Sequence, residues 1–270
     1  MVAAEDASQA DARLVAAECA AVCTKLAAKS AGAGLQASVQ AAIDVLCAMR
    51  DSGTLHASLV HMAFEAVSDD TLRLVFETVA THHLSYAGCV ALVERALTPR
   101  VLALEQPASR ALFATLEATL VRHPKAIVDG LLVPVFLRED IGPAQSEVVC
   151  RLLKEAVKPP FVEQFVQAII APDVASGRWG EQQVAILQQA INRKLTLSAP
   201  VVLALLEHAA ASSERLKQSL KFAKFLLVLV QRYAADIAPH ADLALSIAQK
   251  SETFMKGPLC KAIGEAAKRR

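Results

Sequence analysis

Two groups of cysteine and histidine residues are the clearest candidates for chemistry in this sequence, because thiol and imidazole groups both ligate transition metals. Cys19 and Cys23 stand four residues apart, which would place both thiols on one face of a helix. Two thiols without further ligands do not form a zinc site, so small buried packing is the preferred interpretation. His82 and His83 precede Cys89, but these residues straddle the expected end of a helix, which favours a polar turn.

No other group of polar residues has the spacing of a catalytic or cofactor-binding motif. His56 and His61 are five residues apart and would point to different faces of a helix. Gly32 and Gly34 lack the preceding strand and the third glycine of a dinucleotide-binding loop. The sequence contains no GxSxG nucleophile motif, no P-loop and no HExxH zinc motif. We therefore predict a protein that is not an enzyme, with no catalytic, cofactor-binding or metal-ligating residues.

Composition and charge limit the possible partners. The chain has 270 residues, a net charge of +1 and only 4% aromatic residues, whereas direct nucleic-acid binding usually needs a basic face or interleaved aromatic residues. The densest apolar run, 225–230, is far shorter than the roughly 20 residues that span a bilayer. Residues 1–11 include three acidic and no basic residues, so no secretory signal is expected. We expect no direct contact with nucleic acid, no contact with a membrane, and reduced cysteines.

Apolar residues recur at spacings of three and four along nearly the whole chain, which is typical of amphipathic helices. The stripe from Leu72 to Val79 is one example. The predicted helices cover approximately residues 8–29, 36–51, 55–66, 69–81, 86–97, 107–121, 124–137, 143–157, 160–170, 179–193, 199–210, 214–234, 239–248 and 252–267. Pro134 and Pro258 interrupt two of these apolar runs, and we expect a kink at each.

The short connections between these helices require neighbouring helices to run antiparallel. Successive antiparallel pairs are the unit of an α-solenoid, and no fixed sequence period is visible. The predicted fold is therefore all-α: an irregular α-solenoid of antiparallel helix pairs, similar to HEAT repeats. We divide the chain into an alanine-rich N-terminal helix with a Gly/Ala joint, residues 1–34, and a helical-repeat domain, residues 35–270.

Three lysines form the most regular charged pattern. Lys217, Lys221 and Lys224 fall at spacings of four and three, on one face of the predicted helix 214–234. They are either the solvated stripe of an otherwise buried helix or a small basic patch for an acidic partner. The solvated stripe is the preferred interpretation.

Residues Leu131 to Lys154 consist of two apolar helical runs joined by a polar turn, with Gly142-Pro143 opening the second run. This segment, especially L-L-V-P-V and G-P-A-Q-S-E-V-V-C, resembles the C-terminal helical-repeat domain of Fanconi anaemia group E proteins. Further similarity lies in K-F-A-K-F-L-L at 221–227 and in T-F-M at 253–255. The resemblance covers roughly residues 68 to 267, and larger family members carry a long extension before this domain.

The resemblance implies a non-enzymatic adaptor subunit of the Fanconi anaemia core complex. This complex is a nuclear ubiquitin ligase assembly for the repair of DNA interstrand cross-links. The implied partners are the group C protein, inside the complex, and the group D-two protein, which is recruited for monoubiquitination. No cofactor is implied.

The resemblance also places the recruiting contact at Phe254 and Met255, next to Lys256, on the expected final helix. Two adjacent apolar residues diverge by about 100° on a helix, so one core does not easily bury both. An exposed pair of this kind would be an anchor of the hot-spot type. In the alternative arrangement Phe254 packs against Leu243 or Ile247 in the core.

Two other functions remain open from the sequence. The main alternative is a generic HEAT-like adaptor for protein–protein interaction in transport or signalling, which would have the same architecture. An all-α enzyme or lipid carrier is a third class, and it would need a sizeable internal pocket.

Overall fold

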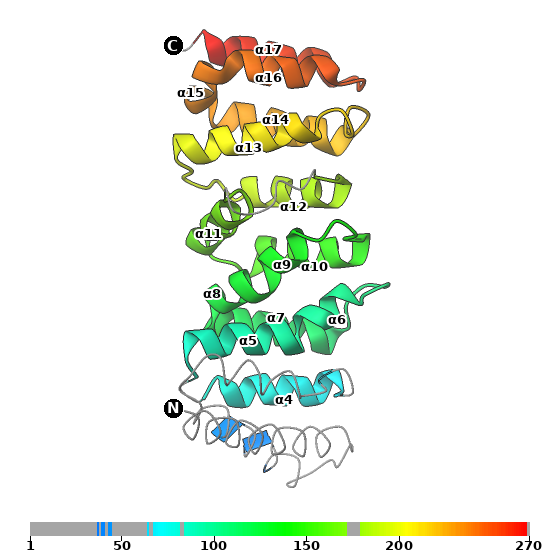
Figure 1. Ribbon diagram of the computed structural model, residues 1–270, viewed down its shortest axis with the longest axis vertical. Helices are drawn as coiled ribbons and strands as arrows, with labels where there is room; N and C mark the ends of the chain where they lie inside the picture. Colours follow the sequence, from blue (N-terminus) through cyan, green and yellow to red (C-terminus); the bar gives the residue numbers. More distant parts are fainter. Residues whose placement is uncertain are drawn as a thin grey trace, which may run out of the picture. The chain divides into compact units, whose positions relative to one another are not determined.

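The computed structural model describes residues 67–81, 84–171 and 179–268, together with the single positions 37, 39, 40, 43, 44 and 64. All regular elements in these ranges are helices and no β-strand occurs in them, which confirms the all-α prediction (Figure 1). The chain divides into two compact units, Met1–Leu131 (unit 1) and Leu132–Arg270 (unit 2). Several predicted features lie outside the described residues, namely the N-terminal helix 8–29 with its joint at 31–34, Cys19, Cys23, His56, His61, His82 and His83.

The three longer helices described in unit 1 each begin after a serine residue. Its described helices are α4 (Asp69–Val79), α5 (Tyr86–Ala96), α6 (Thr98–Leu102), α7 (Arg110–Arg122) and α8 (Pro124–Ile127). Ser68, Ser85 and Ser109 precede α4, α5 and α7, and each hydroxyl accepts an N–H that the helix itself leaves unpaired. α4 packs against α7, and the apolar stripe from Leu72 to Val79 is buried.

The predicted helix 124–137 is divided by a π-helical turn. α8 is followed by the π-helix η2 (Val128–Leu132) and then by α9 (Val133–Phe136), in which Pro134 is the second residue. Pro134 has no N–H to donate to the carbonyl of Gly130, four residues earlier, so the regular α-helical bond cannot form there. The kink expected at Pro134 thus takes the form of a break in the α-helix at η2.

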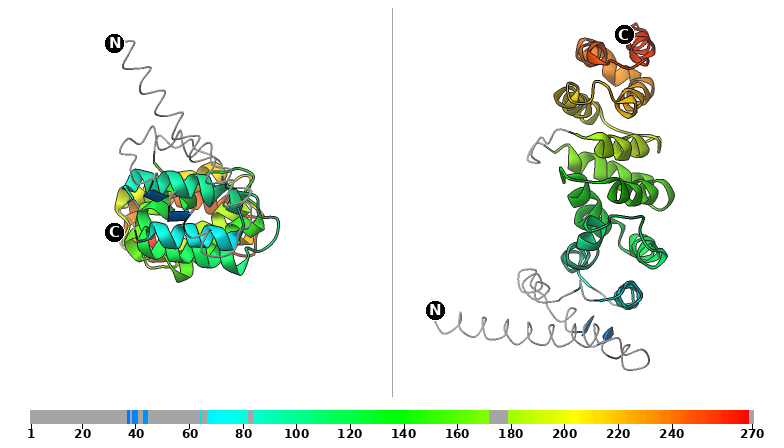
Figure 2. Two further views of the ribbon diagram at one scale, coloured as in Figure 1. Left: turned by 90° about the horizontal axis from the view of Figure 1, so that it is seen from below. Right: turned by 90° about the vertical axis from the view of Figure 1, so that its right-hand side faces the viewer.

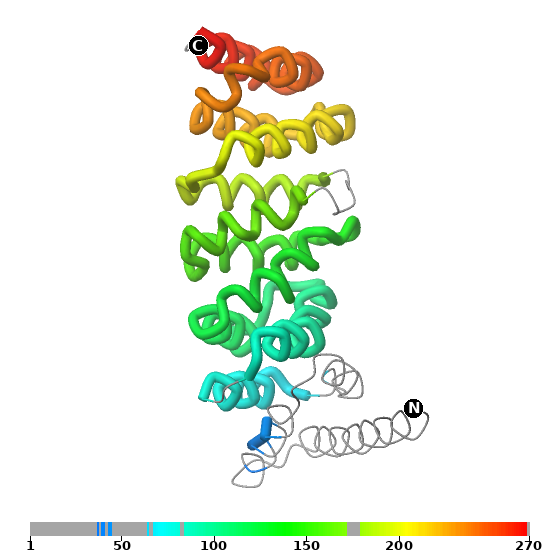
Figure 3. The backbone as a smooth tube through the Cα atoms, turned by 60° about the vertical axis from the view of Figure 1, so that its left-hand side comes forward, coloured from blue at the N-terminus to red at the C-terminus, as the bar shows by residue number. Residues whose placement is uncertain are grey.

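Unit 2 continues from α9 with eight further helices in its described part, counting one 3-10 turn as separate. They are α10 (Pro143–Glu155), α11 (Pro159–Ile169), α12 (Glu181–Ile191), α13 (Ala199–Ser212), α14 (Leu220–Arg232), α15 (Ala234–Ile237), the 3-10 turn η3 (Ala238–His240), α16 (Ala241–Lys250) and α17 (Lys256–Ala267). α10, α12, α14 and α17 lie side by side in that order, and α13 packs against α16. Figure 2 and Figure 3 show the same succession, from green to red. Among the described helices, none combines the length and the apolar character that crossing a membrane requires.

Aromatic residues hold the helices of unit 2 together. The rings of Phe136 and Phe165 meet edge to face, with 5.7 Å between their centres. Trp179, just before α12, packs edge to face with Phe225 at 6.0 Å and stacks on His208 at 5.5 Å. The Trp and Phe rings are almost fully buried, and burying one such side chain stabilises a fold by about 1.5–3 kcal/mol. Because His208 lies on α13 and Phe225 on α14, this cluster fixes those two helices against α12.

Two helices of unit 2 start later than the apolar pattern indicated. The predicted helix 214–234 begins only after Ser219, whose hydroxyl accepts a backbone N–H from the first turn of α14 at 3.0 Å. The predicted helix 252–267 begins at Lys256, so Pro258 is its third residue. A missing N–H has no consequence in the first turn of a helix, because no carbonyl precedes it to accept a bond. The kink expected inside this helix at Pro258 is therefore wrong.

The predicted lysine face is wrong at Lys217 and confirmed at Lys221 and Lys224. Lys217 lies in the turn before α14, whereas Lys221 and Lys224 are exposed on the helix itself. Because the helix is capped after Lys217, the spacing of four to Lys221 does not place these two side chains on a common helical face.

Candidate protein-binding site

The turn between α16 and α17, residues 251–255, carries the predicted partner-binding residues. Ser251 ends α16, where its N–H donates to Ala248 at 3.1 Å. The Ser251 hydroxyl accepts the N–H of Thr253 at 3.3 Å, and the Thr253 hydroxyl accepts the N–H of Met255 at 3.3 Å. These side-chain acceptors satisfy N–H groups that a continuing helix would have paired with carbonyls, so the chain turns here instead. Phe254 therefore sits in a turn, and Met255 is the residue that precedes α17.

Phe254 is the most exposed large apolar residue in the described part of the chain. Its exposed fraction is 78%, against 74% for Val121, and those of Tyr86 and Leu137 are lower still. Packing of Phe254 in the core is thus excluded. Met255 is half-buried beside it. A solvent-exposed aromatic ring on an ordered turn is typical of a binding anchor. When a partner buries such a ring, a large apolar area is removed from solvent.

Lys256 connects this turn back to the helix before it. Its Nζ donates to the carbonyl of Gln249 at 2.6 Å, near the C-terminus of α16. The last carbonyls of a helix have no partner within it and carry partial negative charge, so a lysine there stabilises the helix end. On the other side of the turn, the N–H of Leu259 donates to Met255 at 2.9 Å, and Leu259 is fully buried. The exposed Phe254 thus lies on a turn that hydrogen bonds hold at both ends.

A second turn, residues 213–219 between α13 and α14, lies against the first. Both turns are at the same end of their helices (Figure 1). The N–H of Glu252 donates to the carbonyl of Lys217 at 2.8 Å, and the Lys217 Nζ lies 2.9 Å from the Glu252 carboxylate. The Gln218 amide donates to the other carboxylate oxygen at 2.9 Å. The Gln218 hydrogen bond and then the Lys217 ammonium lower the pKa of Glu252, and Glu252 in turn raises the pKa of Lys217.

Sequence reasoning named Lys217 only as part of a lysine face, and it did not connect Lys217 or Gln218 with Glu252. The two turns are more than 30 residues apart in the chain, and no periodic signal connects a residue in one turn with a residue in another. Their polar character is ordinary for turn residues. Only the packing of α13 against α16 and of α14 against α17 brings them together.

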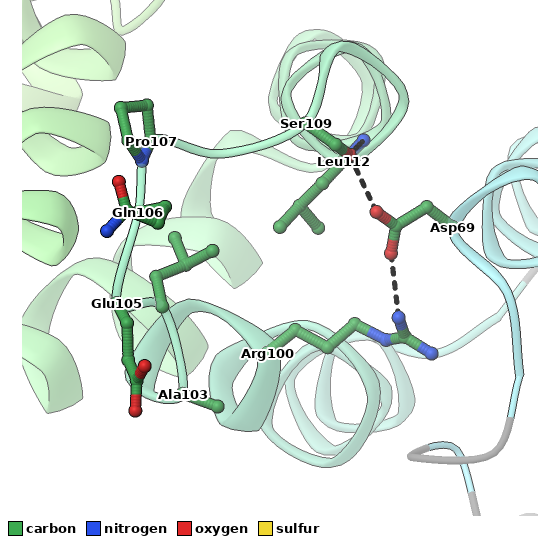
Figure 4. Close-up of a pocket in the computed structure, with 9 residues that line it drawn as sticks. Asp69, Arg100, Ala103, Glu105, Gln106, Pro107, Ser109 and Leu112 are labelled. Carbon is green, nitrogen blue, oxygen red and sulfur yellow. Dashed lines mark hydrogen bonds and ion pairs between the residues drawn. The ribbon is translucent and has the colours of Figure 1, made fainter.

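A cavity of about 480 Å³ in unit 1 is the second feature of interest (Figure 4). It is lined by Asp69, Arg100, Ala103, Leu104, Glu105, Gln106, Pro107, Ser109 and Leu112. The Arg100 guanidinium donates to Asp69 at 2.7 Å and to the backbone carbonyls of Phe64, at 2.7 Å, and Val67. The Ser109 hydroxyl donates to the other oxygen of Asp69 at 2.6 Å. Both oxygens of the carboxylate are therefore occupied, and this cluster ties the start of α4 to α6 and α7 rather than presenting a free acid or base.

Cysteine and histidine meet at one described position. The Cys89 Sγ lies 3.6 Å from Nδ1 of His123, and burial, followed by the Arg122 guanidinium, lowers the pKa of His123. Within the described residues, no three His, Cys, Asp or Glu side chains are grouped closely enough to hold a metal ion. Cys89, Cys150 and Cys260, the cysteines in the described part of the chain, form no disulfide bond there.

A family model described as Fanconi Anaemia group E protein FANCE matches residues 33–267. The chain belongs to this family. The Fanconi anemia group E protein of Homo sapiens is 26% identical over 181 residues, which cover 67% of this chain and 33% of the human protein. This group E family chain thus spans about one third of the length of the curated relative that it matches. The resemblance noted in the sequence is confirmed, and membership of the group E family implies a role in the Fanconi anaemia pathway of DNA repair.

Proposed function

We propose that this chain is a non-enzymatic adaptor subunit of the nuclear Fanconi anaemia core complex. In this role it recruits the group D-two protein for monoubiquitination during the repair of DNA interstrand cross-links, and it binds the group C protein inside the complex. Membership of the group E family supports a role for this chain in the Fanconi anaemia pathway. The observation that carries the recruiting role is the 78% exposure of Phe254 on a turn that is anchored at both ends.

We also infer that the helix pairs form an irregular α-solenoid. Within unit 2, α10, α12, α14 and α17 are each the second helix of a pair, and they lie side by side. Stacked pairs of this kind leave their connecting turns in a row along one edge. Such an edge suits an adaptor, because neighbouring turns combine into one binding surface.

The proposed mechanism uses binding energy alone. An adaptor that holds a substrate protein beside a ligase subunit converts an encounter in solution into a reaction between neighbours, which raises the effective concentration of the target lysine. Phe254 supplies a compact apolar anchor, with Met255 and Lys256 next to it. The chain itself needs no nucleophile and no general base for this role.

The deciding experiment measures the affinity of the purified group D-two protein for the chain and for its double variant Phe254→Ala with Met255→Ala. We expect at least about tenfold weaker binding, which corresponds to 1.4 kcal/mol. The unfolding free energy should stay within about 1 kcal/mol, because Phe254 makes no core contact that would be lost. Val121→Ala is the matched control, since Val121 is also apolar and 74% exposed but lies on α7. Equal affinity of the double variant and the unaltered chain would refute the assignment.

The alternative function, a generic HEAT-like adaptor in transport or signalling, predicts different partners. Affinity purification from cells treated with a cross-linking agent separates the two proposals. Recovery of Fanconi core-complex subunits supports the recruiting role, whereas recovery of transport or signalling proteins alone supports the alternative.

A further inference from the structure

We propose that the surface that binds the group D-two protein consists of two turns, 213–219 and 251–255, and that Glu252 is the residue that positions Phe254. This inference rests on the proposed function. It adds a second segment of the chain to the site and assigns a role to a residue outside the apolar pair.

The two turns are joined at several points. Glu252 contributes three of them, through its N–H to Lys217, its salt bridge to Lys217 and its hydrogen bond from Gln218. Lys250 adds a fourth, since its Nζ donates to the Ser213 hydroxyl at 3.1 Å. Within the turn 251–255, by contrast, the hydrogen bonds from Thr253 and Met255 to side-chain oxygens are 3.3 Å long, near the upper limit for such bonds. The hydroxyls of Ser251 and Thr253 are also 2.9 Å apart. Among the backbone hydrogen bonds of this segment, however, the one from Glu252 to Lys217 is the shortest at 2.8 Å.

These contacts act on local order rather than on the stability of the whole fold. The side chains of Lys217 and Glu252 are 38% and 46% exposed, and ion pairs with this exposure add little to global stability because water screens them. A short turn whose local opening is opposed by few contacts, however, responds strongly to each one. Glu252 is the point where most of these contacts converge.

The side chain of Phe254 is not fixed by contacts of its own ring. At 78% exposure its ring has few protein neighbours, so the direction in which it projects depends on the backbone of residues 252–255. A mobile anchor loses conformational freedom when it binds, and that loss subtracts from the affinity. The contacts of Glu252 restrain the backbone just before Thr253 and Phe254. They therefore reduce the conformational freedom that Phe254 would otherwise lose on binding.

The test compares the binding of the purified group D-two protein to the unaltered chain, to Glu252→Ala, to Phe254→Ala and to the variant with both changes. We expect Glu252→Ala alone to weaken binding about three- to tenfold, in line with the cost of ordering a side chain and its turn. In the Phe254→Ala background the same change should have no further effect, because there is no anchor left to position.

Glu155→Ala is the matched control. Glu155 forms an exposed salt bridge with Arg151 at 3.1 Å on α10, in the same unit but away from both turns. This variant should bind as the unaltered chain does. A loss of affinity in Glu155→Ala equal to that in Glu252→Ala would show an effect of net charge alone and would overturn the proposal.

A second measurement needs no partner. Amide hydrogen exchange of Thr253, Met255 and Lys256 should become faster in Glu252→Ala, while the amides of α10 and α12 stay unchanged. Unchanged exchange in the turn overturns the positioning role, and so does a loss of affinity that persists in the Phe254→Ala background. If the unaltered chain binds while Glu252→Ala binds equally well, only this inference fails. If the unaltered chain does not bind the group D-two protein, the proposed function fails and this inference with it.

Discussion

The hydroxyl of Thr98 donates a hydrogen bond to the carbonyl of Gly130 at 2.6 Å. That carbonyl is the one that the missing N–H of Pro134 leaves without its α-helical partner. Both Thr98 and Gly130 are buried, so water does not replace the bond. Gly130 is also suited to its position, because a Cβ there would lie 3.0 Å from the carbonyl oxygen of Val90. The start of α6 thus completes the hydrogen bonding of the π-helical turn η2.

Thr98→Val should destabilise the protein by about 1–3 kcal/mol, because it keeps the shape of the side chain but leaves a buried carbonyl unpaired. Urea unfolding followed by circular dichroism measures the change. Thr98→Ser retains the hydroxyl and should recover most of the loss. If the valine and serine variants are equally stable, the hydrogen bond to Gly130 does not matter.

Arg100→Leu should destabilise unit 1 by about 2–4 kcal/mol. The change removes the guanidinium that donates to the Asp69 carboxylate and to the carbonyls of Phe64 and Val67. Asp69 keeps the Ser109 hydroxyl and Phe64 keeps the Val67 N–H, but the Val67 carbonyl loses its donor and the salt bridge is broken, which is costly for partly buried groups. The control is Arg73→Ala, which removes an exposed i,i+4 salt bridge with Glu77 and should cost less than about 0.5 kcal/mol. Thermal unfolding of the two variants gives the comparison. Similar losses in both would contradict the role assigned to Arg100.

The stability of the protein should fall as the pH drops through the range in which histidine titrates. Burial lowers the pKa of His123 below its usual 6.5, and its Nε2 is buried with no hydrogen-bond partner in the described part of the chain. The unfolded chain therefore takes up the proton at a higher pH than the folded chain, so this contribution is complete above pH 6.5 and is lost as the pH falls below it.

Unfolding free energies measured between about pH 8 and 5 test this prediction, since the range brackets the usual histidine pKa. His123→Asn should reduce the slope of unfolding free energy against pH, whatever its effect on stability at pH 8. An identical slope in this variant would show that other groups cause the pH dependence.

Much of the helical structure could be predicted from the sequence, because helix formation depends on local properties. The apolar stripe from Leu72 to Val79 identified the buried face of α4. The exposure of Phe254 could also be expected in advance, through the resemblance to the group E family, whereas its role in binding a partner stays a prediction. The position of Phe254 in a turn could not be predicted. Over 251–255 the helix carbonyls and the serine and threonine hydroxyls compete for the same backbone N–H groups, and the sequence does not show which of them win.

Within the described residues, the sequence by itself thus determined most of the helical segments and the apolar faces that they bury, and it indicated the family. Tertiary structure decided how their ends are completed. The carbonyl of Gly130 accepts a hydrogen bond from Thr98, and Glu252 forms a salt bridge with Lys217. In each pair the two residues are more than 30 positions apart in the chain. The physical reason is that a helix satisfies its own backbone in the middle, but its ends and breaks leave polar groups that only a neighbouring segment can pair. Which neighbouring segment lies there depends on tertiary packing, and local sequence patterns do not predict that packing.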